Sequence, residues 1–198
     1  MSKIARRMLL VLSIAVFWAA MPVSPASATA TPPQPGGPLP DIKLPIPEHA
    51  ADKAYLGLTT RGAFTIAQIK AQVVIIEILS MYCPYCQREA PEVNRLYEII
   101  ENNPNLKGKI KLIGIGAGNT PFEVQVFKEK YSVPFPVFSD EDFTLHKVFG
   151  EVRTPFFIGV RINDDGTHRV FYAKLGGIEG AESFVKLMLR LSGLEQEK

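Results

Sequence analysis

The sequence of 198 residues is long enough for one domain of ordinary size and some sequence outside it. Hydrophobic residues make up 46% and charged residues 21%, a globular composition that excludes a disordered or fibrous chain. Residues 1–28 hold three of the 22 basic residues and none of the 20 acidic ones, so without them the formal net charge falls from +2 to −1. The remaining chain therefore has no basic excess for binding nucleic acid.

The first 28 residues have the pattern of a secretory signal peptide. Basic residues precede an apolar run from 8 to 21, and the small residues 26–28 (ASA) form a cleavage signal. The run is shorter than the roughly 20 residues that a membrane-spanning helix needs, so cleavage is expected, with an uncleaved N-terminal anchor as the alternative. Both outcomes predict a folded part in the periplasm or another extracytoplasmic space, where stable disulfides form.

Residues 29–47 hold seven prolines and two adjacent glycines. This composition predicts an extended linker with polyproline character and little buried surface. The folded domain is therefore expected to span residues 48–198, with a frayed polar end at 195–198.

The first part of this domain alternates between strand and helix patterns. The apolar run 73–79 (VVIIEIL) predicts a buried strand of a parallel sheet, and 84–102 has the spacing of an amphipathic helix. Residues 109–115 (KIKLIGI) predict a second buried strand. Residues 120–123 (TPFE) have the spacing of a capping box, which predicts a helix that runs to residue 131.

The C-terminal part predicts a short strand at 136–138 and a short helix at 142–149. Residues 156–162 and 167–174 flank the turn sequence NDDG and predict an antiparallel hairpin, followed by a helix at 181–191. This order of elements predicts an α/β fold in which helices flank a central mixed β-sheet.

The chain has only two cysteines, Cys83 and Cys86, which excludes a four-cysteine zinc site and a multi-disulfide scaffold. They lie where the strand 73–79 meets the helix that begins at Pro84. A helix N-terminus carries unpaired N–H groups and partial positive charge, so Cys83 is predicted to be the nucleophile and the shielded Cys86 to resolve its disulfides. The spacing lets the sulfurs meet in a redox-active disulfide that needs no metal or organic cofactor. An inert structural disulfide is the alternative.

Glu77 is the one acid in the apolar run 73–79. Burying a charged carboxylate is costly, so the pKa of Glu77 is predicted to be raised. Such a carboxylate is suited to accept the proton of Cys86 during disulfide exchange. The alternative is a position at the sheet edge, where Glu77 reaches solvent.

These motifs resemble the thioredoxin superfamily, and within it the exported thiol-disulfide oxidoreductases of the TlpA and ResA type. The resemblance covers about residues 54–191. Its matching features are the Cys83-Pro84-Tyr85-Cys86 motif, Glu77 before it, Pro91 after it, Thr154-Pro155 before the hairpin and Gly176-Gly177 after it.

The resemblance implies a thioredoxin-like fold with a TlpA-type N-terminal extension and an inserted strand and helix between residues 116 and 152. It implies substrates that are protein thiols or disulfides, and a separate, membrane-embedded redox partner; a monomer is expected. The implied catalytic residues are Cys83, Cys86, Glu77 and a cis Pro155. The implied substrate-binding residues are Tyr82, Pro84, Tyr85 and Thr154.

Some positions depart from the family pattern. Tyr82 replaces the usual tryptophan, and Phe156 and Phe157 stand where members that mature cytochromes carry an acid, which argues against a dedicated role in cytochrome assembly. A peroxiredoxin-like peroxide reductase is the enzymatic alternative, because Ser80 lies three residues before Cys83 as that family requires, although Ile76 replaces its proline. A redox-inert binding module with a thioredoxin fold is the non-enzymatic alternative.

Overall fold

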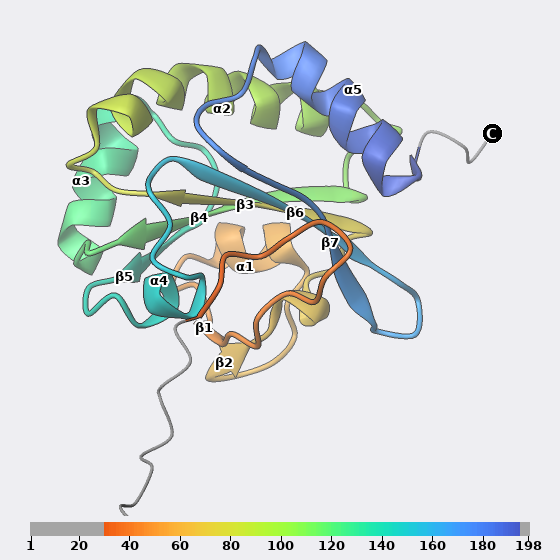
Figure 1. Ribbon diagram of the computed structural model, residues 1–198, viewed down its shortest axis with the longest axis horizontal. Helices are drawn as coiled ribbons and strands as arrows, with labels where there is room; N and C mark the ends of the chain where they lie inside the picture. The colour runs from red at the N-terminus through yellow and green to blue at the C-terminus, as the bar shows by residue number, and fades with distance from the viewer. Residues whose placement is uncertain (1–29, 195–198) are drawn as a thin grey trace, which may run out of the picture.

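The computed structural model describes residues 30–194, so the predicted signal segment 1–28 and the polar end 195–198 lie outside the described residues. Within residues 30–194, a five-stranded sheet has the strand order β5-β4-β3-β6-β7 and carries helices on both faces (Figure 1). The predicted α/β class with a central mixed sheet is therefore confirmed.

The elements follow one another in the predicted order, with additional short elements near the N-terminus. In chain order they are β1 (Leu44–Pro45), α1 (Ala50–Leu56), β2 (Ala63–Phe64), a 3₁₀ turn (Ile66–Gln68), β3 (Val73–Leu79), α2 (Pro84–Asn102), β4 (Ile110–Ala117), α3 (Pro121–Tyr131), β5 (Val137–Asp140), α4 (Thr144–Val148), β6 (Phe156–Ile162), β7 (His168–Leu175) and α5 (Ala181–Ser192).

Strand β3 lies at the centre of the sheet. It pairs in parallel with β4 and antiparallel with β6, and all seven of its residues are buried. Strand β5 extends the sheet in parallel beyond β4, and β7 extends it antiparallel beyond β6. The carboxyl end of β3, which leads to the cysteine motif, therefore lies beside the end of β4 and the start of β6.

The alternation of side chains along β3 divides the core into two layers. Val74, Ile76 and Ile78 belong to the cluster that contains the buried residues of the N-terminal segment, whereas Val73, Ile75 and Leu79 pack with α2 and α5. Figure 1 shows α2 and α5 on one face of the sheet and α1 and α4 on the other. By the same alternation, Glu77 belongs to the face that α2 covers.

Helix α2 begins as its sequence predicts. The Cys83 sulfur accepts a hydrogen bond from the Cys86 backbone N–H, and Pro84 occupies the first helical turn, where its missing N–H costs nothing. The buried residues of α2 form one helical stripe, Cys86, Ala90, Val93, Leu96 and Ile100. None of the helices within residues 30–194 combines the length and apolar composition needed to cross a membrane.

The prediction that residues 29–47 form a linker is wrong for the described part of this segment. Leu39, Ile42 and Leu44 are buried in the core, and Gly36 and Gly37 exchange backbone hydrogen bonds with Val170 of β7. The chain turns at residues 35–37, and the apolar residues between the prolines cover the sheet face opposite α2. The domain therefore includes residues 30–47 instead of starting at 48.

Candidate active site

The two cysteines lie together at the start of α2, and both are free thiols. Cys83 is partly exposed, whereas Cys86 is fully buried at 0%. The Cys83 thiol donates a hydrogen bond to the Thr154 carbonyl at 3.3 Å and accepts one from the Cys86 N–H at 3.3 Å. The accessible sulfur thus faces the loop before β6.

The two thiols have opposite pKa shifts. Partial burial acts to raise the pKa of Cys83, but hydrogen bonds from the side chains of Cys86 and Thr154 and from the backbone amides of Cys86 and Tyr85 outweigh it, so this pKa is lowered. The pKa of Cys86 is raised, mainly by burial and further by its hydrogen bond with Cys83 and by the nearby Glu77 carboxylate. This asymmetry makes Cys83 the more acidic and more accessible thiol of the pair.

The asymmetry predicts the order of alkylation. When the reduced protein reacts with iodoacetamide near neutral pH, we expect Cys83 to carry the label while Cys86 stays unmodified, because only the thiolate reacts and Cys86 is buried and protonated. Mass spectrometry of the labelled peptides measures this order, and labelling of both cysteines in denaturant is the control. Earlier labelling of Cys86 would reverse the two roles.

Glu77 lies in the middle of the central strand, between Gly114 of β4 and Phe157 of β6. It is 3% exposed, so the alternative of a solvent-facing edge position is wrong. Burial, together with the charges of Glu89 and Cys83, raises the pKa of Glu77 from 4.5 to about 8. A carboxylate with this pKa exchanges its proton near neutral pH beside the cysteine pair.

The other residues singled out in the sequence surround the Cys83 thiol. The peptide bond between Thr154 and Pro155 is cis. Tyr82 and Tyr85, on either side of the nucleophile, are each 64% exposed, and Pro84 is exposed as well. The structure therefore brings these residues together at one end of the sheet.

Hydrogen bonds that the sequence did not predict fix the loop before Cys83. Asn119, fully buried after β4, accepts a hydrogen bond from the Met81 N–H at 2.8 Å and donates one to the Ser80 hydroxyl at 3.4 Å. The Gln87 amide donates to the Met81 carbonyl at 2.7 Å. The Tyr82 hydroxyl donates to Glu123, whose carboxylate also completes the capping box of α3 with Thr120.

Replacement of Asn119 by alanine is expected to lower the free energy of unfolding by about 1–3 kcal/mol, because it leaves the partly buried Met81 amide without its partner. Denaturant unfolding measures this loss. Asn105→Ala is the matched control, because Asn105 is exposed and its side chain forms no hydrogen bond within the described residues. Equal stability of the two variants would show that Asn119 does not hold the loop.

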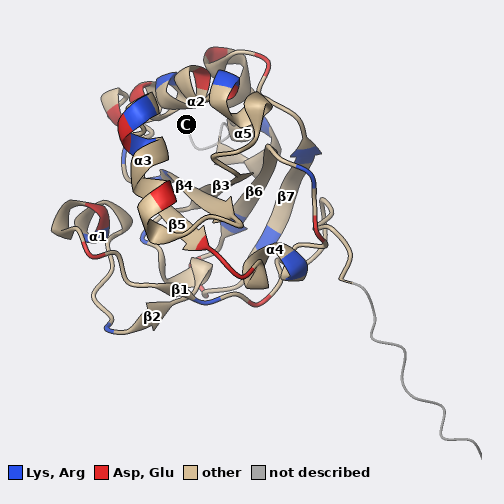
Figure 2. Cartoon of the chain, turned by 90° about the vertical axis from the view of Figure 1, so that its left-hand side faces the viewer, with Lys and Arg blue, Asp and Glu red and all other residues tan. Residues whose placement is uncertain are grey.

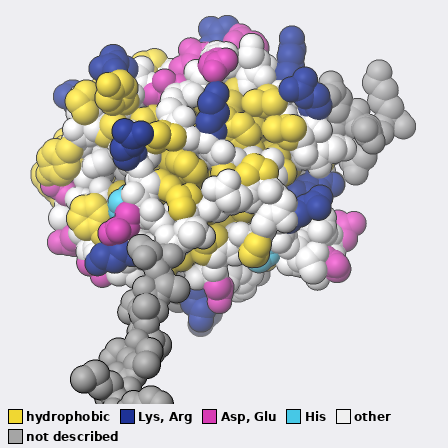
Figure 3. Space-filling view, viewed as in Figure 1, with side chains coloured by type: hydrophobic (Ala, Val, Ile, Leu, Met, Phe, Trp, Pro, Cys, Tyr) yellow, Lys and Arg dark blue, Asp and Glu magenta, His cyan; other side chains and the backbone are white. Residues whose placement is uncertain are grey.

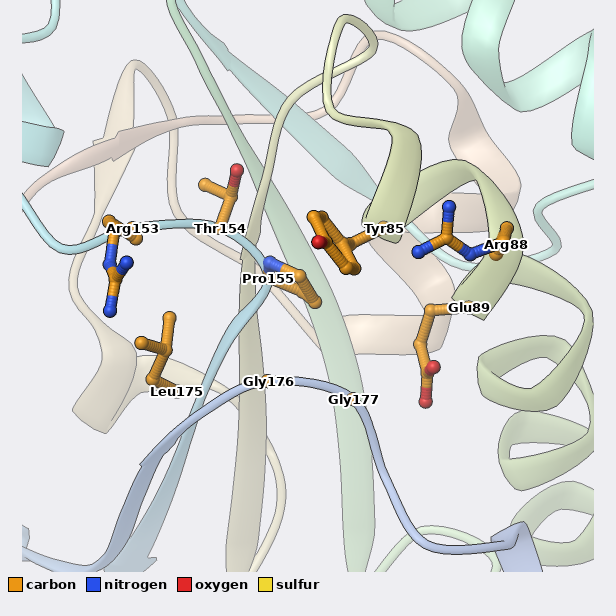
Figure 4. A pocket seen from close by; sticks show the side chains of 9 residues that line it. All are labelled: Tyr85, Arg88, Glu89, Arg153, Thr154, Pro155, Leu175, Gly176 and Gly177. Carbon is orange, nitrogen blue, oxygen red and sulfur yellow. The ribbon is translucent and has the colours of Figure 1, made fainter.

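A pocket of ≈ 370 Å³ opens beside the cysteine motif (Figure 4). The Arg88 guanidinium lies 4.5 Å from the centre of the Tyr85 ring, and the Glu89 carboxylate accepts a hydrogen bond from the Ile178 N–H at 2.6 Å. The pocket is lined by Tyr85, Arg88, Glu89, Arg153, Thr154, Pro155, Leu175, Gly176 and Gly177. We call it the arginine pocket. Among residues 30–194, no group of three or more His, Cys, Asp or Glu is placed to hold a metal ion.

Known proteins resemble this chain in sequence and in fold. The thiol-disulfide oxidoreductase ResA of Halalkalibacterium halodurans is 24% identical over 125 residues, which cover 62% of this chain and 66% of that protein. The chain therefore spans just under two thirds of the length of this relative.

Solved structures share the fold at lower identity. A thiol:disulfide interchange protein DsbE from Chlorobium tepidum superposes with a TM-score of 0.59 at 16% identity, covering 81% of this chain and 99% of the other. StoA from Bacillus subtilis gives a TM-score of 0.51 at 20% identity, covering 77% of this chain and 98% of the other. These likenesses confirm the thioredoxin-like fold.

A family model describes most of the domain. The model of the AhpC/TSA family matches residues 35–173, a range that begins in the packed N-terminal segment and includes both cysteines, Glu77 and the Thr154-Pro155 pair. The chain belongs to the AhpC/TSA family of thioredoxin-like proteins.

Proposed function

We propose that the protein is an exported thiol-disulfide oxidoreductase that exchanges disulfides with cysteines of other proteins. The observation that carries this proposal is the asymmetry of the cysteine pair: an accessible thiol with a lowered pKa begins α2, and a buried thiol with a raised pKa follows one helical turn later. This arrangement separates attack on a substrate from release of the product.

In the reducing direction, the Cys83 thiolate attacks one sulfur of a substrate disulfide. A mixed disulfide forms, and the other substrate sulfur leaves as a thiolate. Cys86 then loses its proton and attacks the Cys83 sulfur, which releases the second substrate thiolate. The substrate gains two electrons, and the cysteine pair becomes a disulfide that a separate reductant must reduce. Oxidation of a substrate dithiol follows the same steps in reverse.

Glu77 is proposed to take up the proton that Cys86 loses in the second step. With a pKa of about 8, a fraction of Glu77 is deprotonated near neutral pH, and this carboxylate form accepts the proton. The charge of Glu77 also contributes to the raised pKa of Cys86, which supports a coupling between the two groups. Thr154, Pro155, Tyr82, Pro84 and Tyr85 are proposed to contact the substrate around Cys83.

Three further assignments belong to this proposal. The composition of residues 1–28 supports export to the periplasm or another extracytoplasmic space. The single cysteine pair supports a separate redox partner, for which the family resemblance implies a membrane-embedded protein. We also propose that the protein acts as a monomer.

An assay of insulin reduction with dithiothreitol tests the activity, with peroxide consumption measured in parallel. We expect the protein to accelerate insulin precipitation and to consume peroxide no faster than Cys83→Ser does. Peroxide consumption that depends on Cys83, without insulin reduction, would instead indicate a peroxiredoxin-like enzyme. No activity in either assay, with the cysteines intact, would indicate a binding module.

A further inference from the structure

We infer that the protein prefers substrates in which an acidic residue lies near the reacting cysteine on one side and an apolar residue lies on the other. This inference rests on the proposed function and assigns it a substrate class. Its basis is a surface on which two cationic side chains and several exposed aromatic side chains surround Cys83.

The surface around Cys83 is unusually apolar. Of the six large hydrophobic side chains that are exposed within residues 30–194, four line the hollows beside the nucleophile: Tyr82 (64%), Tyr85 (64%), Phe143 (44%) and Leu175 (40%). Exposed apolar groups gathered at one place are typical of an interaction site. In the space-filling view, yellow hydrophobic side chains lie next to Lys and Arg over much of one face (Figure 3).

Two hollows meet at Arg153 and Thr154. One is the arginine pocket, which reaches from α2 to the turn after β7. The other, of ≈ 440 Å³, lies among Tyr82, Phe143, Val152 and the end of β4, and we call it the tyrosine groove. Because the Cys83 thiol lies 3.3 Å from the Thr154 carbonyl, a polypeptide that presents its cysteine to Cys83 extends from one hollow into the other.

The arginine pocket carries the charge that selects an acidic residue. Arg88 and Arg153 line it, and neither forms an ion pair with any residue between 30 and 194, in contrast to Arg95, which pairs with Glu182. The Tyr85 ring supports the Arg88 guanidinium from one side, which orients this group at the pocket. Both guanidinium groups are therefore free to bind a carboxylate.

Glu89 is the one acid of the arginine pocket, and it does not neutralise these two arginines. Its carboxylate accepts the hydrogen bond from the Ile178 N–H, and Figure 4 shows it pointing toward Gly177, away from Arg153. Gly177 leaves no space for a Cβ atom beside this carboxylate, so the Glu89 side chain packs directly against the turn after β7. Partial burial also raises the pKa of Glu89.

The tyrosine groove has a different character. Its apolar lining is Tyr82, Ala117, Phe143 and Val152, whereas Arg153 stands at its border with the arginine pocket and Glu151 is its only carboxylate. Charge is mixed elsewhere on this side of the molecule, where α2 and α3 carry basic and acidic residues in alternation (Figure 2). Arg88 lines the arginine pocket alone, so the two guanidinium groups converge only there, and this difference gives a bound polypeptide a direction across Cys83.

Peptides with a single cysteine, capped as a disulfide with 2-mercaptoethanol, test the inference. The set places Asp or Asn on one side of the cysteine and Leu or Ser on the other, in both orders. Of the two peptides that carry both Asp and Leu, one should react faster. At low salt we expect the reduced protein to reduce this peptide about fivefold faster than the same peptide with Asn in place of Asp. High salt should weaken this preference. Replacement of Leu by Ser in this peptide should also slow its reduction.

The double variant R88Q/R153Q is expected to lose the preference for Asp. The matched control is R61Q/R169Q, which removes the same charge at exposed positions that line neither hollow, and it should keep the preference. Hydroxyethyl disulfide, which is small and neutral, measures exchange without a contact in either hollow, and the wild type and R61Q/R169Q should reduce it at equal rates. Equal rates for Asp and Asn peptides, or a preference that survives R88Q/R153Q, would overturn the inference. Failure to reduce hydroxyethyl disulfide would refute the proposed function instead.

Discussion

Replacement of Cys83 by serine is expected to abolish disulfide exchange, so that insulin reduction falls to the rate of dithiothreitol alone. Cys83 supplies the only partly exposed thiol, and the remaining Cys86 is fully buried with a raised pKa. The measurement is the insulin assay with matched protein concentrations. Substantial remaining activity in Cys83→Ser would remove Cys83 from the role of nucleophile.

Cys86→Ser should behave differently, because the attacking thiolate is kept and only its resolving partner is lost. Mixed disulfides with substrates are therefore expected to accumulate on Cys83. Non-reducing electrophoresis detects them as adducts that dithiothreitol dissociates. The double variant, which lacks both thiols, is the control for adducts that do not depend on the site.

Replacement of Glu77 by glutamine is expected to change how stability depends on pH. Folding raises the pKa of Glu77 from 4.5 to about 8, so the folded protein keeps a proton that the unfolded chain releases between these values. The stabilising contribution of Glu77 is thus complete below pH 4.5 and is lost as pH rises toward 8, by at most about 1.4 kcal/mol per pH unit.

The glutamine variant lacks this loss because its side chain does not titrate. Relative to the wild type, its free energy of unfolding should therefore increase with pH, by on the order of 4 kcal/mol between the two pKa values. Denaturant unfolding across this pH range measures the difference. Glu98→Gln, at an exposed position on α2, is the control, and its free energy of unfolding should depend on pH in the same way as that of the wild type. If the free energy of unfolding of Glu77→Gln had the same pH dependence as that of the wild type, the pKa of Glu77 would not be raised in the folded protein.

The same variant tests the proposed chemistry. Without a group to accept the Cys86 proton, resolution of the mixed disulfide should slow by up to roughly 10²-fold, while the alkylation rate of Cys83 stays nearly unchanged. Rapid quenching of a single turnover separates these two steps. Unchanged resolution rates would leave Glu77 with an effect on stability alone.

Local patterns explain why much of the fold could be predicted. Neighbouring residues alone identify three of its features: the apolar run of β3, the apolar stripe of α2 and the capping box of α3. The buried position of Glu77 followed from its place in an apolar run, and the greater accessibility of Cys83 followed from its place before a helix.

The predictions failed where structure depends on distant partners. The proline-rich composition of residues 30–47 indicated a linker with little buried surface, and only the sheet face beneath Ile76 explains why Leu39, Ile42 and Leu44 are buried. Asn119 was missed for a similar reason, because its bond to Met81 joins loops 38 positions apart. Its signal was a polar residue directly after a glycine-rich strand end.

The packing of the N-terminal segment also bears on the order of folding. Backbone hydrogen bonds connect Gly36 and Gly37 of the N-terminal segment to Val170 in β7, the last strand along the chain. The segment can form these hydrogen bonds only when β7 is present beside it. Such contacts between residues far apart in sequence slow folding, because a long loop must close before they form. Leu39, Ile42 and Leu44 share one core cluster with Val170, so this cluster is complete only when β7 is in place.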